Sequence, residues 1–163
     1  MKYRVAGGTL TVKARSSVHD TVTTWDSIAG DVDADPDALA NAKASFSVDM
    51  TKFDAGDWLK NRKLRKDFDM DAHPRATFTL TRVGDVVRDG AKFKASAEGT
   101  LSWRGKDVVL AVTGEGTLDD ASVSATGSFV LDIRRLGLSA PRFLMIKMSD
   151  EVEVSVTFRG AKL

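Results

Sequence analysis

The chain has 163 residues, the length of one domain, and we expect residues 1–163 to fold as a single unit. Its 24 Lys and Arg residues balance 23 Asp and Glu residues, so a formal net charge of +1 argues against nucleic acid as a partner. Cysteine is absent, which excludes disulfides and thiolate chemistry, and the two histidines, His19 and His73, are too few for a multi-histidine metal site.

No stretch approaches the roughly 18 apolar residues that span a bilayer. Lys2 and Arg4 give the chain a positive start, but no apolar run of the kind found in signal peptides follows them. The sequence therefore predicts no stable membrane insertion and a cytoplasmic location. A periplasmic or secreted protein whose leader has been removed fits the same sequence.

Apolar and polar residues alternate along much of the chain. The alternating segments are 10–14, 44–50, 76–80, 93–103, 123–131 and 152–158. Successive side chains of a strand point to opposite faces, so this pattern predicts strands with one buried and one solvated face. Turn-forming residues separate them at 83–85, 88–90, 104–107 and 114–116. About eight hairpin-linked strands predict an all-β barrel or sandwich.

One segment breaks the alternation. Asp57 is a good N-terminal cap, and residues 58–66 suit about two helical turns. We expect a short helix at about 55–66 across one end of the sheet, with Trp58, Leu59, Leu64 and Phe68 packed inward.

Small residues occupy many of the predicted inward positions. They are Ala14, Ala44, Ala95, Ala97, Gly99, Ala121, Ala125 and Gly127. An eight-stranded barrel is wide enough either to be filled by side chains or to hold one small ligand. Small inward residues favour a cavity, and a tapered core in which small residues face large ones fits the same pattern.

Charged clusters give weaker signals. Residues 60–66 hold five cations, which would suit an anionic head group at a barrel mouth, although a solvated helix face is the simpler interpretation. The alternating acids of 31–37 resemble the start of a calcium loop but have Pro36 at the glycine position and Ala42 at the last ligand position. We expect no metal site.

Ser16, His19 and Asp20 lie close together in the sequence. Neighbouring strand residues point to opposite faces, and the chain has no G-x-S-x-G motif, so these three residues do not predict a nucleophile triad. A hydrolase using His19 and Asp20 is the remaining enzymatic hypothesis, and no catalytic residue is expected.

Two groups of residues match sequence patterns of a known protein family, in the same order along the chain. Leu64-Arg65, Asp67-Phe68, Pro74 and Phe78 match an L-R…D-F…P-x-x-x-F pattern. Residues 99–105, followed by Val108, match a G-x-L-x-x-x-G…V hairpin. With these segments the chain resembles, from Tyr3 to Lys162, the YceI-like family of lipocalin-like barrels that bind polyisoprenoids and related lipids.

The resemblance implies an elongated antiparallel eight-stranded β-barrel whose apolar channel binds, stores or transports an isoprenoid or another long-chain lipid without catalysis or a cofactor. The residues expected to line this channel are Leu10, Val12, Trp25, Ile28, Phe46, Val48, Phe78, Leu80, Ala95, Ala97, Leu101, Trp103, Ala125, Phe129, Val154 and Val156. Lys63, Arg65, Arg134 and Arg135, with Arg142 as a further candidate, are the cations expected near the lipid head group.

A second hypothesis belongs to a different class of protein. A ligand-free barrel with a filled core would act through its surface as a structural or interaction protein. A homodimer formed through an exposed sheet edge is compatible with the sequence. The expected partners are thus a lipid ligand or a second protein surface, and no nucleic acid.

Overall fold

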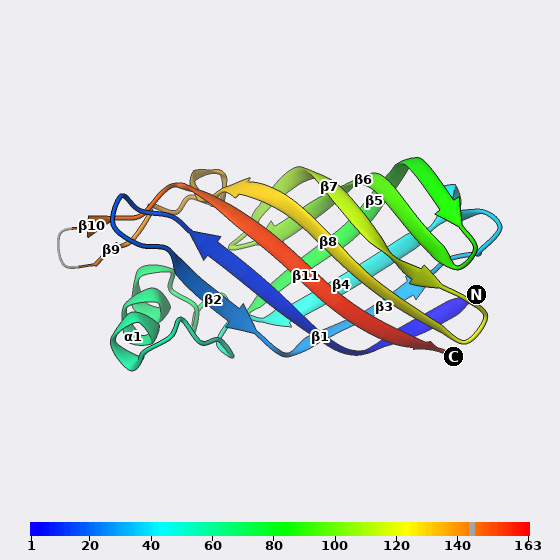
Figure 1. Ribbon diagram of the computed structural model, residues 1–163. Coiled ribbons are helices and arrows are strands. Elements are labelled where there is room, and N and C mark those ends of the chain that lie inside the picture. The colour runs from blue at the N-terminus through cyan, green and yellow to red at the C-terminus, as the bar shows by residue number, and fades with distance from the viewer. Residues whose placement is uncertain (144–145) are drawn as a thin grey trace.

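Eight antiparallel strands close into an elongated barrel in the computed structural model, which describes residues 1–143 and 146–163 and leaves out the side chains of 142, 143 and 146 (Figure 1). The barrel strands are β1 (Lys2–Ala14), β3 (Ile28–Asp33), β4 (Lys43–Asp49), β5 (Arg75–Asp89), β6 (Lys92–Trp103), β7 (Lys106–Leu118), β8 (Ser122–Asp132) and β11 (Glu151–Lys162). The prediction of an all-β, eight-stranded barrel with one short helix is confirmed.

The remaining elements are short. They are β2 (Thr21–Trp25), the 3-10 helices η1 (Leu39–Asn41) and η2 (Ile133–Leu136), the helix α1 (Trp58–Asp67), and the two-residue strands β9 (Arg142–Phe143) and β10 (Ile146–Lys147). No helix among the described residues is long and apolar enough to cross a bilayer.

Pairing of the first and last strands closes the barrel. β1 pairs with β11 from Tyr3↔Lys162 to Ala14↔Val152, with one register shift between Val5 and Gly7. On its other edge, β1 pairs with β3 near its start and with β2 from Leu10 onward. One long strand thus joins the two ends of the sheet and carries the extra strand β2.

The two ends of the barrel differ. α1 and the β9–β10 hairpin lie at one end, which we call the helix end (Figure 1). Both chain termini, η1 and the β5–β6 and β7–β8 turns lie at the opposite end, which we call the loop end (Figure 1).

Capping fixes where α1 begins, and the helical repeat then places Leu64 on the face that packs against the barrel. The Asp57 carboxylate accepts a 2.8 Å hydrogen bond from the Lys60 backbone N–H. Trp58 and Leu59 are 68% and 62% exposed, so the prediction that they pack inward is wrong. At about 100° per residue, these first two helical positions lie across the helix from Leu64, which is buried against the barrel.

Two predicted turns lie inside strands. Residues 83–85 belong to β5, which accommodates them with register shifts of the bulge type between Leu80 and Val86. Residues 114–116 belong to β7, where a Cβ on Gly116 would overlap the Ser124 carbonyl oxygen of β8. Gly116 therefore serves the close approach of β7 and β8, whereas Gly90 and Gly105, with φ of +61° and +74°, form true turns.

Apolar side chains form two separate cores. The helix-end core consists of Trp25, Met50, Ala55, Leu64, Met70, Ala76, Trp103, Val108, Leu110, Leu131, Ile133, Leu136, Leu138, Ala140, Met148, Val152 and Val154. The smaller loop-end core consists of Tyr3, Val32, Ala34, Leu118 and Val123. In the loop-end core the Tyr3 hydroxyl donates a 2.7 Å hydrogen bond to the Asp119 carbonyl, and burial raises the pKa of this phenol so that it stays a donor.

η2 contributes two side chains to the helix-end core where β7 and β8 separate. The β7–β8 pairing ends at Thr113↔Ser128 on the side toward the helix end. Leu136 is 2% exposed there, so Leu136→Ala should lower the free energy of unfolding by about 2–5 kcal/mol. Urea denaturation measures the change, and Leu163→Ala, at a position 64% exposed, is the control, with an expected effect within about 0.5 kcal/mol. Equal effects of the two variants would contradict this account of the core.

Candidate functional site

A cavity of about 250 Å³ occupies the barrel interior between the two cores. Its wall is formed by Leu10, Ile28, Val32, Ala34, Leu39, Ala42, Ala44, Phe46, Val48, Ala76, Thr77, Phe78, Leu80, Val83, Phe93, Ala95, Ala97, Leu101, Val112, Gly114, Leu118, Val123, Ala125, Thr126, Gly127, Phe129, Val156 and Phe158. Among these described wall residues, only Thr77 and Thr126 have polar side chains. The space therefore suits an apolar ligand.

The exposure of inward side chains also indicates a hollow interior. Phe78, Leu80 and Phe129 point into the barrel yet remain only partly buried. Val108 and Leu110, which belong to the helix-end core, are 1% and 4% exposed. The difference arises because the former line open space and the latter are packed on all sides.

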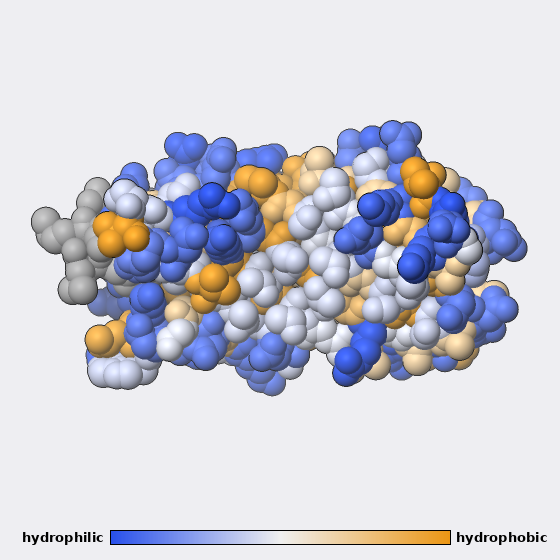
Figure 2. All heavy atoms as spheres, viewed as in Figure 1, coloured by the Kyte–Doolittle hydropathy of each residue, from blue (hydrophilic) through white to orange (hydrophobic). Residues whose placement is uncertain are grey.

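The outer face is mostly hydrophilic or neutral in the view of Figure 2, with hydrophobic surface in small patches. The exposed large apolar side chains are scattered over several elements, as Val87 on β5, Val109 on β7 and Val130 on β8 illustrate. The extended apolar surface of this protein is therefore inside the barrel.

Most residues that the sequence assigns to a channel lie around this cavity. The cavity wall includes Leu10, Ile28, Phe46, Val48, Phe78, Leu80, Ala95, Ala97, Leu101, Ala125, Phe129 and Val156. Whether these side chains contact a ligand stays a prediction.

Val12, Trp25, Trp103 and Val154 do not line the cavity. They pack in or against the helix-end core. The indole N–H of Trp25 donates to the Met50 carbonyl over 3.2 Å, and that of Trp103 donates to the His73 carbonyl over 2.8 Å. These hydrogen bonds hold both rings among the residues that cover the barrel end.

The sequence analysis did not assign several wall residues. Ala44, Ala76, Phe93, Val123 and Phe158 lie on the alternating segments, so the period of two already placed them on an inner face. Leu39 and Ala42, in and next to η1, had no such signal. They reach the cavity because the connection between β3 and β4 folds over the loop end.

The predicted head-group cations of α1 lie away from the cavity wall. Lys63 pairs with Asp67 over 2.9 Å. Arg65 pairs with Asp71 over 2.9 Å and donates to the Thr51 carbonyl over 2.8 Å. Both cations are at the helix end, where the helix-end core separates them from the cavity.

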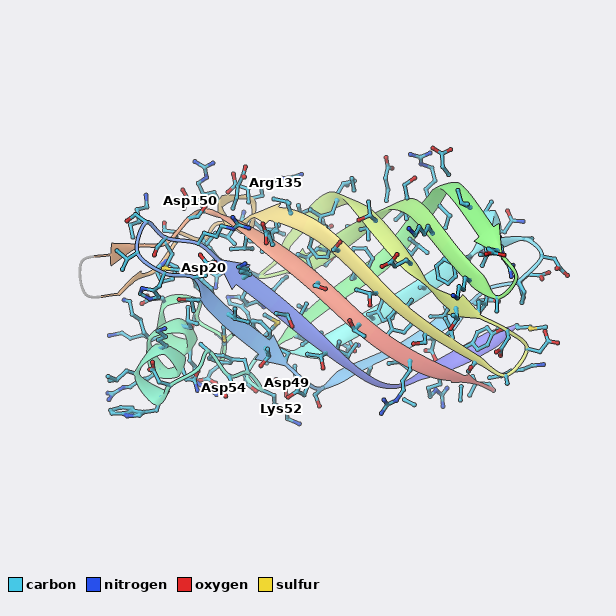
Figure 3. The ribbon with its side chains drawn as sticks, in the orientation of Figure 1. Asp20, Asp49, Lys52, Asp54, Arg135 and Asp150 are labelled. Carbon is cyan, nitrogen blue, oxygen red and sulfur yellow. The ribbon has the colours of Figure 1, made fainter. Side chains whose placement is uncertain are left out.

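Arg134 and Arg135 also stand at the helix end. Arg134 pairs with Asp132 over 2.7 Å and approaches Asp150 at 3.8 Å. Arg135 donates to the Val109 carbonyl over 3.4 Å, and Figure 3 shows it at the helix end, beyond β8. The structure does not bring either guanidinium to the cavity wall, and the Arg142 side chain lies outside the described ones.

The Ser16–Asp20 segment has no triad arrangement. The Ser16 hydroxyl accepts from the backbone N–H of Val18 and His19 and donates to the His19 carbonyl. Asp20 pairs with Lys13 over 3.4 Å. Among the described residues, no group of three or more His, Asp or Glu side chains is placed to hold a metal ion.

The fold and the cavity together define a class of protein, the eight-stranded antiparallel barrel with an apolar interior, an architecture able to enclose one small ligand. The chain belongs to the YceI-like family, because the YceI-like domain matches residues 4–159. No curated protein sequence matches the chain.

Solved structures share this fold at low sequence identity. BcnA of Burkholderia cenocepacia is 20% identical, with a TM-score of 0.78 over 93% of this chain and 95% of its own. A polyisoprenoid binding domain from Saccharophagus degradans, implicated in plant cell wall breakdown, is 15% identical, with a TM-score of 0.79 over 99% and 98%. The YCEI protein of Campylobacter jejuni is 15% identical, with a TM-score of 0.70 over 86% and 84%.

The Asp132–Arg134 ion pair gives a test by pH. Hydrogen bonds from Arg134 hold the pKa of the Asp132 carboxyl below its usual range. A carboxyl with a lowered pKa in the folded state stabilises the fold above its unfolded pKa of about 3.9, and this stabilisation is lost as the pH falls further. In urea denaturation, Asp132→Asn should therefore have a lower free energy of unfolding than wild type at pH 7. The two free energies should converge below about pH 4.

The exposed Asp89→Asn is the matched control for this titration, since Asp89 lies at the turn end of β5. A difference between Asp132→Asn and wild type that stays constant from neutral to acidic pH would contradict the assigned role of the ion pair.

Proposed function

We propose that this protein binds a polyisoprenoid or a similar lipophilic molecule in its barrel cavity, without catalysis, and so stores or transports it. The observation that carries the proposal is the apolar cavity of about 250 Å³ between the two cores. An apolar cavity of about 150 Å³ already stays free of water and takes up benzene. The larger cavity here suits a branched hydrocarbon chain.

Burial of apolar surface supplies the affinity. Each methylene transferred from water to an apolar site contributes about 0.8 kcal/mol. In the part of the chain that the structure describes, the side chains of the wall provide no charged group and two hydroxyls, those of Thr77 and Thr126, so they match a hydrocarbon chain better than a head group. We therefore place the head group outside the cavity.

We place the mouth at the loop end. The helix end is covered by the larger core, which includes Trp25 and Trp103. At the loop end, Leu39 and Ala42 line the cavity and are still partly exposed, so the cover there is thin. A chain entering from this side would leave its polar head near the chain termini.

The family supports the same function. The Saccharophagus degradans neighbour is described as a polyisoprenoid binding domain, and its fold matches nearly the whole chain. Among the residues that the structure describes, the wall of the cavity also has no carboxylate, lysine or histidine that could act as a general base for the Thr77 or Thr126 hydroxyl. Binding without chemical turnover is thus the function that the cavity supports best.

Native mass spectrometry of protein purified from cells without detergent tests this proposal. The expected result is an added mass of lipid size that denaturation releases and organic extraction recovers. In parallel, a prenyl alcohol such as farnesol should raise the melting temperature, since a ligand that binds only the native state stabilises it. An unliganded mass together with an unchanged melting temperature across prenyl and acyl lipids would overturn the proposal and favour a protein that acts through its surface.

Filling the cavity should abolish uptake. Ala97 and Ala125 both line the wall, so Ala97→Trp and Ala125→Trp should each reduce farnesol binding at least about tenfold while the far-ultraviolet circular dichroism keeps its β spectrum. The matched control is Ala111→Trp, because Ala111 is exposed on the outer face of β7. Wild-type binding by both cavity variants would show that the ligand site lies elsewhere.

A further inference from the structure

Two pairs of phenylalanine rings cross the barrel interior. Phe78 of β5 faces Phe129 of β8, with ring centroids 6.1 Å apart and planes inclined by 11°. In the sheet, β6 and β7 lie between these two strands, so the contact spans the interior. Phe46 of β4 and Phe158 of β11 form the second pair at 4.9 Å, across strands separated by β3 and β1.

The two pairs are neighbours at different depths in the barrel, because Phe46 of β4 and Phe78 of β5 are direct cross-strand partners. All four rings line the cavity. Phe129 packs against the helix-end core, whereas Phe46 and Phe158 pack against the loop-end core. Phe129 therefore stands at the side of the cavity toward α1. The Phe46–Phe158 pair lies within the cavity, because wall residues such as Leu39 and Leu118 continue beyond it toward the loop end.

Few residues separate the cavity from the helix-end core. The residues that both line the cavity and belong to or contact that core are Leu10, Val48, Ala76, Leu101 and Phe129. Phe129 has the largest side chain among them and meets a ring from the opposite wall. It is therefore the main side chain that a ligand would meet at the helix-end limit of the cavity.

A glycine fixes the position of the opposing ring. A Cβ on Gly99 of β6 would overlap the Cζ atom of Phe78. Gly99 is buried and pairs with Leu80 of β5, two residues along the strand from Phe78, so its missing side chain makes the space in which the Phe78 ring lies. Any larger residue at position 99 would push this ring toward the open space.

From these contacts we infer that the Phe78–Phe129 pair is the floor of the cavity and sets the longest hydrocarbon chain that the protein accepts. This inference rests on the proposed function. A chain that enters at the loop end extends along the barrel until it meets these two rings, and further isoprene units must then stay outside. Gly99 maintains the floor by keeping the Phe78 ring against β6.

Binding of a series of prenyl alcohols tests the floor. Geraniol, farnesol and geranylgeraniol are titrated into wild type and Phe129→Ala, and bound fractions are measured by native mass spectrometry. The quantity compared is the affinity for geranylgeraniol divided by the affinity for geraniol. This ratio should be at least about tenfold higher in Phe129→Ala than in wild type. Each newly buried methylene raises the affinity about fourfold, so a tenfold change corresponds to burial of about two more methylenes.

The matched control is Phe53→Ala. Phe53 also packs against the helix-end core and contacts Trp25, at 5.8 Å between ring centroids, but does not line the cavity. Phe53→Ala should loosen the same core and leave the ratio of affinities at its wild-type value. A ratio that shifts equally in both variants would overturn the inference, because it would indicate general softening of the core.

Wild type separates the failure of this inference from the failure of the proposed function. If wild type binds none of the alcohols, the proposed function fails. If wild type binds them and a folded Phe129→Ala keeps the wild-type ratio, only the floor is wrong. Phe129→Leu, which keeps a large apolar side chain, replaces Phe129→Ala if the alanine variant does not fold, and a smaller shift in the same direction is expected.

Gly99→Ala gives a second test with the opposite sign. The added methyl group should push the Phe78 ring into the cavity and weaken the binding of farnesol at least about tenfold. Adding Phe78→Leu to the same chain should restore binding, because the shorter side chain no longer reaches residue 99. A loss of binding that Phe78→Leu does not restore would contradict the role assigned to this ring.

Discussion

The pairing of β1 with β11 is the constraint on which the rest of the structure depends. It runs along nearly the whole of both strands and closes an open sheet into a barrel, with β2 as an extra strand at one edge. Closure gives every barrel strand one face toward a shared interior. The apolar residues of distant segments, such as Leu10 and Phe158, then surround one space.

The two ends of the barrel interior are closed by different amounts of apolar side chain, and this asymmetry creates the cavity. At the helix end, α1, η2 and the segment before β11 supply large side chains, among them Leu64, Leu136 and Met148, that fill the barrel. At the loop end only a small core and the η1 segment cover the opening. Between them the inward residues are alanine, glycine or phenylalanine at many positions, and the barrel stays hollow.

The phenylalanines do more than add apolar surface. A ring that reaches across the interior makes contacts that two alanines on facing strands could not make, so each pair holds opposite walls together. The glycines at positions 30 and 99 are the counterpart of these rings, since a Cβ on Gly30 would lie 2.9 Å from the Cδ1 atom of Phe46. Large and small residues are thus paired by position, and the unpaired small residues leave room for a ligand.

The sequence by itself determined the inner faces of six of the eight barrel strands and the position of the helix, because alternation and capping are local properties. It also placed Phe78, Ala97 and Phe129 on the inner face, where the cavity formed. It did not locate β3 or β7 by alternation, and it predicted turns inside β5 and β7. Only the tertiary structure decided that Trp25 and Trp103 cover an end, that Leu39 reaches the cavity and that Lys63, Arg65, Arg134 and Arg135 stand away from it. These properties depend on strand tilt, on register and on the path of connections over the barrel ends, which arise from contacts between residues far apart in the chain.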